Sequence, residues 1–216
     1  MDQLERIVIG LPGIVAGLAL HEYAHAVAAH SLGDDTPRRA GRLTPEPWVH
    51  LDPIGTILIL LYGFGWGKPV PVNPGSFRDQ RKGYLLVAIA GPAANIILAF
   101  LFAAGYGFAS IAAPSLPVLR VLDEGVWINA NLAALNLIPL PPLDGGKVLS
   151  AILPAGARDT YGRLASLAPV FVTLLMVTGV ALPFLAGVST KVGLLAGLPG
   201  QAFGRAIGVL LRGARL

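Results

Sequence analysis

The segment from His21 to His25 has the sequence His-Glu-Tyr-Ala-His, which combines the side chains that metal-assisted hydrolysis requires. Two histidines four positions apart lie on one face of an α-helix, so both imidazoles can bind the same metal ion. Glu22 follows the first histidine, where its carboxylate can act as a general base on water. The spacing matches the H-E-x-x-H pattern of helical zinc sites, and it predicts hydrolysis of peptide bonds.

The motif lies within an apolar stretch of about residues 7–30, and this location makes the pattern more specific. About 20 mostly apolar residues are enough for a helix to cross a bilayer. Ionisable side chains inside such a helix are costly unless they are paired or coordinated. This favours a metal site within the membrane. The alternative is a pair of histidines satisfied by hydrogen bonds at a polar helix interface.

The composition of the chain is that of a membrane protein. Of its 216 residues, 54% are hydrophobic and 13% are charged, and the mean hydropathy is +0.67. Soluble domains carry about 25% charged residues. No cysteine is present, so disulfides, thiolate ligands and a cysteine nucleophile are excluded, and a metal would be held by His, Asp or Glu. The net charge of +4 comes from basic residues between apolar stretches, which favours membrane topology over nucleic-acid binding.

Further apolar stretches predict the other membrane elements, with spans at about residues 83–113, 121–153 and 164–186 and a Gly-rich stretch at 192–211. The span 121–153 is interrupted by Pro139, Pro141 and Pro142. The last is either a weak fifth span or an interfacial helix. Residues 53–66 are apolar but too short to cross comfortably, which favours a re-entrant or interfacial segment. We therefore expect an all-α polytopic membrane protein of four to five transmembrane helices, with a short re-entrant or β-like membrane-associated segment between the first two.

The chain is expected to be one integral membrane domain (1–216), with a core at 7–155 and peripheral C-terminal helices at 163–216. Its N-terminal stretch lacks a basic n-region and an A-x-A cleavage site, so we expect it to be retained. The basic residues predict its orientation. A group of them falls between residues 34 and 82: Arg38, Arg39, Arg42, Lys68, Arg78, Arg81 and Lys82. Because cytoplasmic loops carry an excess of Lys and Arg, this region is predicted to lie in the cytoplasm and the N-terminus outside.

A catalytic zinc ion needs a third protein ligand and an open position for water. Ser31 occupies the position at which another histidine follows in some helical zinc motifs, and His30 lies one residue off that face. Glu46 stands between two prolines in a polar loop, where a solvated carboxylate is expected. Asp144 remains, because it is an acid inside the apolar stretch 121–153 and needs a partner there.

Depth in the membrane supports Asp144 as the third ligand. His21 and Asp144 each lie roughly ten residues from the cytoplasmic end of their stretch, which at about 1.5 Å of rise per residue places both about 15 Å below that surface. Asn95 has a similar depth in the stretch 83–113. Three polar positions at one level in three helices predict a shared site.

With these features the chain resembles the site-2 protease family of intramembrane zinc metalloproteases, in its compact prokaryotic branch without PDZ or CBS domains. The resemblance extends to about residue 155. It rests on His21-Glu22-Tyr23-Ala24-His25, on Gly91-Pro92-Ala93-Ala94-Asn95, on residues 136–145 (Asn-Leu-Ile-Pro-Leu-Pro-Pro-Leu-Asp-Gly), and on the loop pieces 40–44, 50–53 and 65–74. The sequence Thr44-Pro45-Glu46-Pro47 stands where the family pattern has an Asn-Pro pair.

The resemblance implies one zinc ion per chain, held by His21, His25 and Asp144, with Glu22 activating water. It also implies that Asn95 and Asn136 lie near the substrate or the oxyanion. For Asn95, a hydrogen bond that packs two helices is the alternative. The prolines before Asp144, Pro142 among them, break the helix and would leave room for an extended substrate, or they simply position Asp144.

The implied activity is that of an intramembrane zinc metalloendopeptidase, which hydrolyses peptide bonds within or near transmembrane segments of membrane proteins. Such activity serves regulated intramembrane proteolysis or the turnover of membrane proteins and signal peptides. The expected location is a prokaryotic cytoplasmic membrane, multi-pass, with the active site toward the cytoplasm. Expected partners are a transmembrane protein substrate and the lipid bilayer, without nucleic acid, and a homo-oligomer stays open. A transporter or channel and a catalytically silent scaffold are the competing classes.

Three smaller expectations concern the loops. The stretches Leu43-Thr44 and 70–72 would supply a strand edge with which a substrate can pair. His50 and Asp52 are interpreted as a structural hydrogen-bonded pair rather than a second metal site. The aromatic residues Trp48, Tyr62 and Trp66 are interpreted as anchors at the membrane interface.

Overall fold

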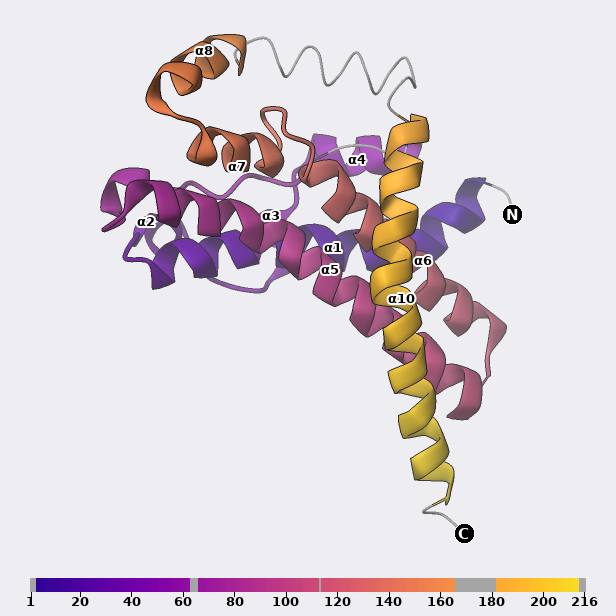
Figure 1. Cartoon of the computed structure of the whole chain (residues 1–216). Coiled ribbons are helices and arrows are strands. Elements are labelled where there is room, and N and C mark those ends of the chain that lie inside the picture. The colour runs from indigo at the N-terminus through magenta and orange to yellow at the C-terminus, as the bar shows by residue number, and fades with distance from the viewer. Residues whose placement is uncertain (1–2, 63–65, 113, 166–181, 214–216) are drawn as a thin grey trace.

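The computed structural model describes residues 3–62, 66–112, 114–165 and 182–213, and within these ranges the regular elements are all helical (Figure 1). This confirms the predicted all-α class. The long helices are α1 (Gln3–Ser31), α5 (Gln80–Ala112), α6 (Leu116–Asn136) and α10 (Leu182–Gly213). The shorter elements are α2 (Thr36–Arg39), α3 (Pro47–His50), α4 (Pro53–Tyr62), the 3-10 helix η1 (Pro74–Ser76), α7 (Asp144–Ile152) and α8 (Ala155–Ala165).

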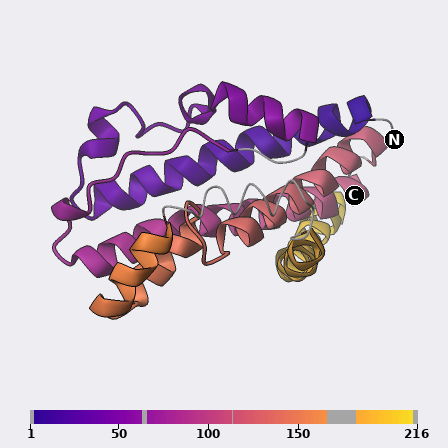
Figure 2. The same ribbon diagram turned by 90° about the horizontal axis from the view of Figure 1, so that it is seen from above.

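Helices α1, α5 and α6 pack against one another, and they build the centre of the molecule. Helix α1 and helix α5 run side by side in both ribbon views. Helix α10 packs across α5 and α6 at a steep angle, so that Figure 2 shows it nearly end-on while α1 and α5 are seen along their length. Helix α7 lies against α5 and joins the packed group after the turn that follows α6.

Within the described ranges, three helices are long and apolar enough to cross a membrane: Ile7–Ser31 in α1, Gln80–Ala112 in α5, and Thr190–Leu211 in α10. These agree with two of the predicted spans and give the Gly-rich C-terminal stretch the length and composition of a span. They support a multi-pass membrane protein. The predicted span 164–186 falls largely outside the described residues.

The stretch predicted as one span at 121–153 is instead two helices, α6 and α7, joined by a turn. Helix α6 ends at Asn136 because Pro139, Pro141 and Pro142 follow and cannot continue a helix. Helix α6 is not among the helices apolar enough to cross, since Arg120, Asp123 and Glu124 lie in its first half.

The predicted β-like segment does not form a strand in the described residues. Residues 53–62 form helix α4, and the nearest approach to a sheet is an isolated antiparallel bridge between Leu51 and Gly67. The segment 68–74 is rich in proline, which has no backbone N–H and removes the donors that a β-ladder needs. The stretches Leu43-Thr44 and 70–72 form no strand in the described residues, and their pairing with a substrate stays a prediction.

Small residues allow the long helices to approach closely. The fully buried alanines are Ala26, Ala29, Ala99, Ala103, Ala130 and Ala133. Helix α10 meets α5 through glycines: a Cβ atom on Gly204 would overlap the carbonyl group of Ala104, and one on Gly107 would overlap the carbonyl group of Gln201. Within a membrane such close backbone contact replaces the hydrophobic effect as the source of helix association.

Replacing Gly204 with alanine is therefore expected to destabilise the packing of α10 on α5. The added methyl group meets backbone, which cannot move aside cheaply, and overpacking of this kind costs about 1–3 kcal/mol. Gly187→Ala on the same helix is the matched control, because its Cβ would meet open space. The thermal midpoint of the purified protein in detergent should fall for Gly204→Ala and stay unchanged or rise for Gly187→Ala. Equal midpoints for both variants would contradict this packing.

Candidate metal centre

Two elements bring three potential metal ligands together at the centre of the helix pack. Helix α1 supplies His21 and His25 one turn apart, and Asp144 is the first residue of α7. All three side chains are buried, and their ligand atoms lie within 4.8 Å of one another. Asp144 Oδ2 is 3.1 Å from His21 Nε2 and 3.0 Å from His25 Nε2, and the two Nε2 atoms are 3.1 Å apart.

This geometry fits a zinc ion. Nitrogen and oxygen ligands stand about 2.0–2.2 Å from zinc in a tetrahedral site, which puts neighbouring ligand atoms roughly 3.3 Å apart. The three observed separations are close to that value. Two imidazoles and one carboxylate also leave a fourth position open, as in catalytic zinc sites.

Hydrogen bonds on the far side of each imidazole fix which nitrogen faces the centre. His25 Nδ1 donates to the backbone carbonyl of Val87 at 2.7 Å, and His21 Nδ1 donates to Asn95 Oδ1 at 2.7 Å. Both Nε2 atoms are then left without a hydrogen and can offer a lone pair to a metal. Partners of this kind orient metal-binding histidines and raise their basicity.

Helix α5 carries these partners on the face that it turns toward α1. Val87, Gly91 and Asn95 follow one another at intervals of four and therefore lie in one row. Gly91 is required for the approach, because a Cβ atom there would stand 2.6 Å from His21 Nε2 and would overlap His25 Nε2. The pattern Gly91-Pro92-Ala93-Ala94-Asn95 thus has a physical reason at its first and last positions.

Asp144 reaches the histidines because the turn after α6 folds back tightly. Gly145 and Gly146 pack against the backbone of residues 137–141, where any Cβ would overlap a carbonyl group or a backbone atom. The second carboxylate oxygen, Oδ1, accepts a hydrogen bond from Lys147 Nζ at 2.7 Å. One oxygen of Asp144 therefore faces the two imidazoles while the other is held by a cation.

Both ends of α7 are tied to neighbouring elements. Arg81 at the start of α5 donates to three carbonyl groups at the end of α7, those of Ala151, Ile152 and Leu153. The hydroxyl of Tyr161 on α8 lies 3.2 Å from the carbonyl oxygens of Pro139 and Gly146. These contacts hold the third candidate ligand at a fixed position relative to α5.

Glu22 lies beside the ligands but is held by a loop. Its Oε2 accepts a hydrogen bond of 3.1 Å from the N–H of Val70. Gly67 also lies close, since a Cβ atom placed on it would be 3.4 Å from the Cγ of Glu22. Within the described part of the chain, the other oxygen, Oε1, has no hydrogen-bond partner. The carboxylate is thus oriented at one oxygen and available at the other.

A buried polar pair anchors the loop that holds Glu22. The guanidinium of Arg42 donates to the carbonyl of Lys68 and lies 3.5 Å from His50 Nδ1, while His50 Nε2 donates to the carbonyl of Thr44 at 2.7 Å. The N–H of Lys68 in turn donates to the carbonyl of His50 at 2.8 Å. Burial lowers the pKa of His50, and the charge of Arg42 lowers it further, so the imidazole is neutral near pH 7 and its Nδ1 can accept.

The same loop is also held by Asp34, whose side chain is fully buried. Its two oxygens accept from the N–H groups of Thr36 at 2.9 Å and Asn73 at 2.6 Å. Burial by itself raises the pKa of Asp34, but these hydrogen bonds outweigh it and keep the pKa below its ordinary value. The charged carboxylate therefore links the end of α1 to the segment before η1.

The other predicted site residues are Asn95, Asn136 and Pro142. Asn95 lies at the site, where its amide is used by His21 and by neighbouring helices. Asn136 is half-buried at the end of α6 and donates to the carbonyl of Leu132 on its own helix at 2.9 Å. Pro142 is exposed in the turn before Asp144. Contact of these residues with a substrate stays a prediction.

The expected pair of His50 and Asp52 is wrong. His50 bonds Thr44 and Arg42, whereas Asp52 Oδ1 accepts from the N–H of Gly55 at 2.8 Å and so caps the start of α4. A carboxylate before a helix binds the free N–H groups there in preference to a more distant side chain.

The two rejected ligand candidates lie away from the centre. His30 pairs with Asp35 at 3.0 Å at the end of α1, and Glu46 is exposed before α3. Sequence reasoning missed Asn129 of α6, which is fully buried beside Asn95. Asn129 could have been identified as Asn95 was, because it is also a polar side chain in an apolar stretch.

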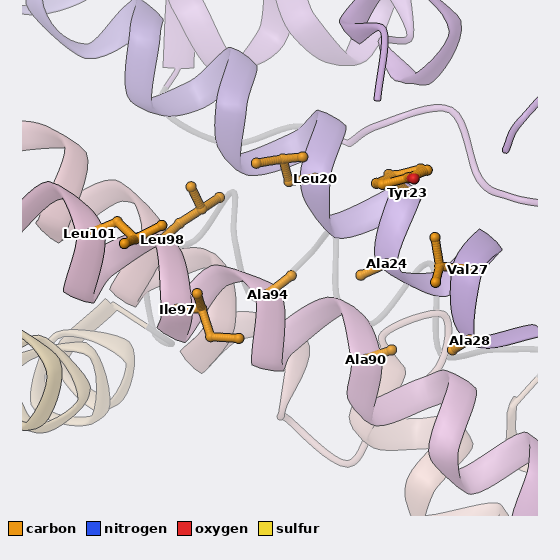
Figure 3. Close-up of a pocket in the computed structure, with 10 residues that line it drawn as sticks. All are labelled: Leu20, Tyr23, Ala24, Val27, Ala28, Ala90, Ala94, Ile97, Leu98 and Leu101. Carbon is orange, nitrogen blue, oxygen red and sulfur yellow. The ribbon is translucent and has the colours of Figure 1, made fainter. Parts of the chain in front are cut away.

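An apolar groove runs along the seam of α1 and α5, with a volume of about 450 Å³ (Figure 3). Two of the lining residues directly precede site residues in the sequence: Ala24 precedes His25 on α1, and Ala90 precedes Gly91 on α5. The lining is aliphatic apart from Tyr23. The groove therefore offers no metal ligand, and the candidate chemistry lies at the other side of the same seam.

Comparison with known proteins agrees with this centre. The model of peptidase family M50 matches residues 108–178, which include Asp144. A protein of Bacillus subtilis, "Putative zinc metalloprotease YwhC", is 40% identical over 171 residues, covering 76% of this chain and 78% of the relative. The chain belongs to peptidase family M50. It is thus a zinc metalloprotease of the site-2 protease type, as the resemblance implied.

Other relatives of the M50 protein come from a mycobacterium and an archaeon. "Putative zinc metalloprotease Rip2" of Mycobacterium tuberculosis is 30% identical over 78% of this chain and 66% of the relative. "Putative zinc metalloprotease MJ0611" of Methanocaldococcus jannaschii is 31% identical over 66% of this chain and 69% of the relative. No solved structure matches the chain.

Gly91→Ala is expected to disturb the metal centre of the M50 protein directly. The methyl group would displace both imidazoles, so zinc affinity should fall at least about tenfold, a loss typical of disturbed ligand orientation. Gly162→Ala on α8 is the control, because its Cβ would meet open space. Competition with a zinc chelator measures the affinity. Wild-type affinity in Gly91→Ala would contradict the proposed arrangement of the ligands.

Arg42→Met is expected to loosen the loop that holds Glu22 without changing zinc binding. Loss of a hydrogen bond to a charged group costs about 1.5–3 kcal/mol, so the amides of Lys68 and Val70 should exchange hydrogen roughly ten or more times faster. The exposed Arg38→Met provides the control. Hydrogen exchange followed by mass spectrometry measures the effect, and equal exchange in both variants would show that Arg42 does not anchor this loop.

Proposed function

We propose that the M50 protein is an intramembrane metalloendopeptidase that hydrolyses peptide bonds within or near transmembrane segments of membrane proteins. In this proposal His21, His25 and Asp144 hold one zinc ion per chain, and Glu22 is the general base. The observation that supports it most is the convergence of three buried ligand atoms between helices long and apolar enough to cross a membrane. Because burial of these groups is costly, their placement requires a partner such as a metal.

The roles of the residues follow from their contacts. When bound, zinc supplies Lewis acidity, which polarises a carbonyl group and makes water a better nucleophile near neutral pH. The Nδ1 partners Asn95 and Val87 keep both histidines in the orientation that presents Nε2. Glu22 takes a proton from water on its free Oε1 and passes it to the amine that leaves when the peptide C–N bond breaks.

Access for the substrate is proposed at the turn between α6 and α7. A transmembrane helix hides its peptide groups in its own hydrogen bonds and must unwind before hydrolysis. The turn at 137–143 is irregular backbone next to Asp144, with Pro142 exposed and Asn136 at its start. Asn136 is proposed to leave its bond to Leu132 and contact the substrate or the oxyanion, and Pro142 to line its path.

The proposed location is a prokaryotic cytoplasmic membrane, with the metal centre reached from the cytoplasmic side. The basic residues between α1 and α5 support this orientation, since they cluster at one end of both helices. Arg38, Arg39, Arg78 and Lys82 are all exposed there. The loop that holds Glu22 belongs to the same region, so the proposed orientation would put this loop toward the cytoplasm.

Glu22→Gln is expected to abolish proteolysis while zinc stays bound. Loss of a general base lowers the rate about 10²–10⁴-fold, and the amide keeps the shape of the side chain. The exposed Glu46→Gln is the matched control. Membranes of a host that produces each variant would be compared for new protein N-termini inside transmembrane segments. Identical sets of cleavage products from wild type and Glu22→Gln would contradict the proposed activity.

A further inference from the structure

Asn129 of α6 is a fully buried amide whose polar atoms are all engaged. Its Nδ2 donates to the backbone carbonyl of Gly125 at 2.9 Å and to that of Gly13 on α1 at 3.4 Å. Its Oδ1 accepts from Asn95 Nδ2 at 3.0 Å. Asn129 therefore joins α1, α5 and α6 at one point.

The direction of these hydrogen bonds is fixed by groups that cannot reverse. A backbone carbonyl can only accept, so the two carbonyl groups around Asn129 require its NH2 group on their side. Its oxygen must then point at Asn95. This orientation in turn requires Asn95 to present its NH2 group, which also donates to the carbonyl of Gly17 at 3.1 Å.

With its NH2 group turned to Asn129, Asn95 can offer only its oxygen to His21. The oxygen accepts from His21 Nδ1, which must carry the hydrogen, and His21 Nε2 is left with its lone pair toward Asp144 and His25. The carbonyl groups of Gly13 and Gly125, through Asn129, and that of Gly17, on Asn95 directly, thus determine which nitrogen of His21 faces the metal centre.

The crossing of α1 and α6 is shaped to admit this chain of hydrogen bonds. A Cβ atom on Gly17 would lie 2.8 Å from Asn129 Oδ1, and one on Gly13 would lie 3.0 Å from the Cα of Gly125. Larger residues at these positions would separate the helices and move Asn129 out of reach of Asn95.

We propose that Asn129 is a positioning residue of the metal centre, which acts through Asn95 to hold His21 in the tautomer that binds the metal. The inference rests on the proposed function, because it takes His21 as a metal ligand. It adds a residue of α6, a helix that supplies no ligand, to the groups that determine metal affinity. Asn129 does not touch the ligands itself, so its effect passes through the orientation of one amide.

Asn129→Leu tests this role, with Asn131→Leu as the matched control. Asn131 lies two residues further along α6 and is exposed, and its one hydrogen bond to the described residues is to the carbonyl of Trp127 on its own helix. Zinc affinity of the purified full-length protein, measured by competition with a chelator, should fall about tenfold for Asn129→Leu, at the lower end of the loss seen for partners of metal ligands. Asn131→Leu should keep wild-type affinity. The visible spectrum of the cobalt-loaded protein should shift for Asn129→Leu alone.

A double-mutant cycle separates positioning from a general effect on packing. If Asn129 acts through Asn95, then Asn129→Leu should lower zinc affinity little further in a protein that already carries Asn95→Leu. Asn129→Asp retains an oxygen that accepts from Asn95, and in the neutral form that burial favours its hydroxyl can donate to the carbonyl group of Gly125 or of Gly13, so it should recover most of the affinity lost in Asn129→Leu. This variant also provides the test if Asn129→Leu does not fold.

Several outcomes would overturn the inference. These are wild-type zinc affinity in a folded Asn129→Leu protein, full additivity with Asn95→Leu, or an Asn129→Asp protein as weak as Asn129→Leu. Failure of the proposed function has a different signature: wild-type protein that binds no zinc, or cleavage that Glu22→Gln leaves intact. If wild type binds zinc and cleaves while the Asn129 variants bind zinc as well as wild type, only the inference about Asn129 fails.

Discussion

Ionisable and amide side chains in the middle of an apolar helix pack have no water to bond, so each must find its partner within the protein. Here this constraint applies to two imidazoles, one carboxylate and two asparagines, all buried where α1, α5, α6 and α7 meet. Each imidazole has an acceptor on one nitrogen and the shared ligand position on the other. The arrangement of the helices follows from satisfying these groups together.

The arrangement of the helices also depends on small residues at their contacts. The polar groups can meet only if the helix backbones approach closely, and glycine occupies the points of closest approach at Gly17, Gly91, Gly125 and Gly145. At Gly91 the neighbour is the pair of imidazoles, and at Gly17 it is the amide of Asn129. Packing and chemistry therefore depend on the same positions, and a larger residue there would affect both.

The candidate ligands were predictable from sequence because each is an ionisable residue in an apolar stretch, where few alternatives to coordination exist. Helix spacing related His21 to His25, and the need for a partner led to Asp144. Asn129 obeys the same rule and carries the same signal, a polar side chain in an apolar stretch, but that signal does not identify its partners on other helices. Its role depends on hydrogen-bond directions across three helices, which only a three-dimensional arrangement reveals.

The errors share a physical origin. Residues 121–153 are apolar enough to suggest one span, but the prolines at 139–142 turn the chain, and this turn is what brings Asp144 back to α1. The predicted β-like segment forms no strand in the described residues for the same reason, since the prolines around Val70 remove the donors of a ladder. Composition alone weighs such residues too little, because their effect is on backbone direction and hydrogen bonding.

The site is held by two kinds of structure that differ in stiffness. The ligands are fixed by contacts between helices, with Asp144 held through Lys147, Arg81 and the glycines of α7. Glu22 is instead oriented by one N–H group of a loop, which Arg42 and His50 anchor. A metal site gains from rigid ligands, whereas the proposed mechanism requires an unwound substrate to enter beside Glu22. In the proposed mechanism the loop is thus the element that would adjust to a substrate while the arrangement of the candidate ligands stays unchanged.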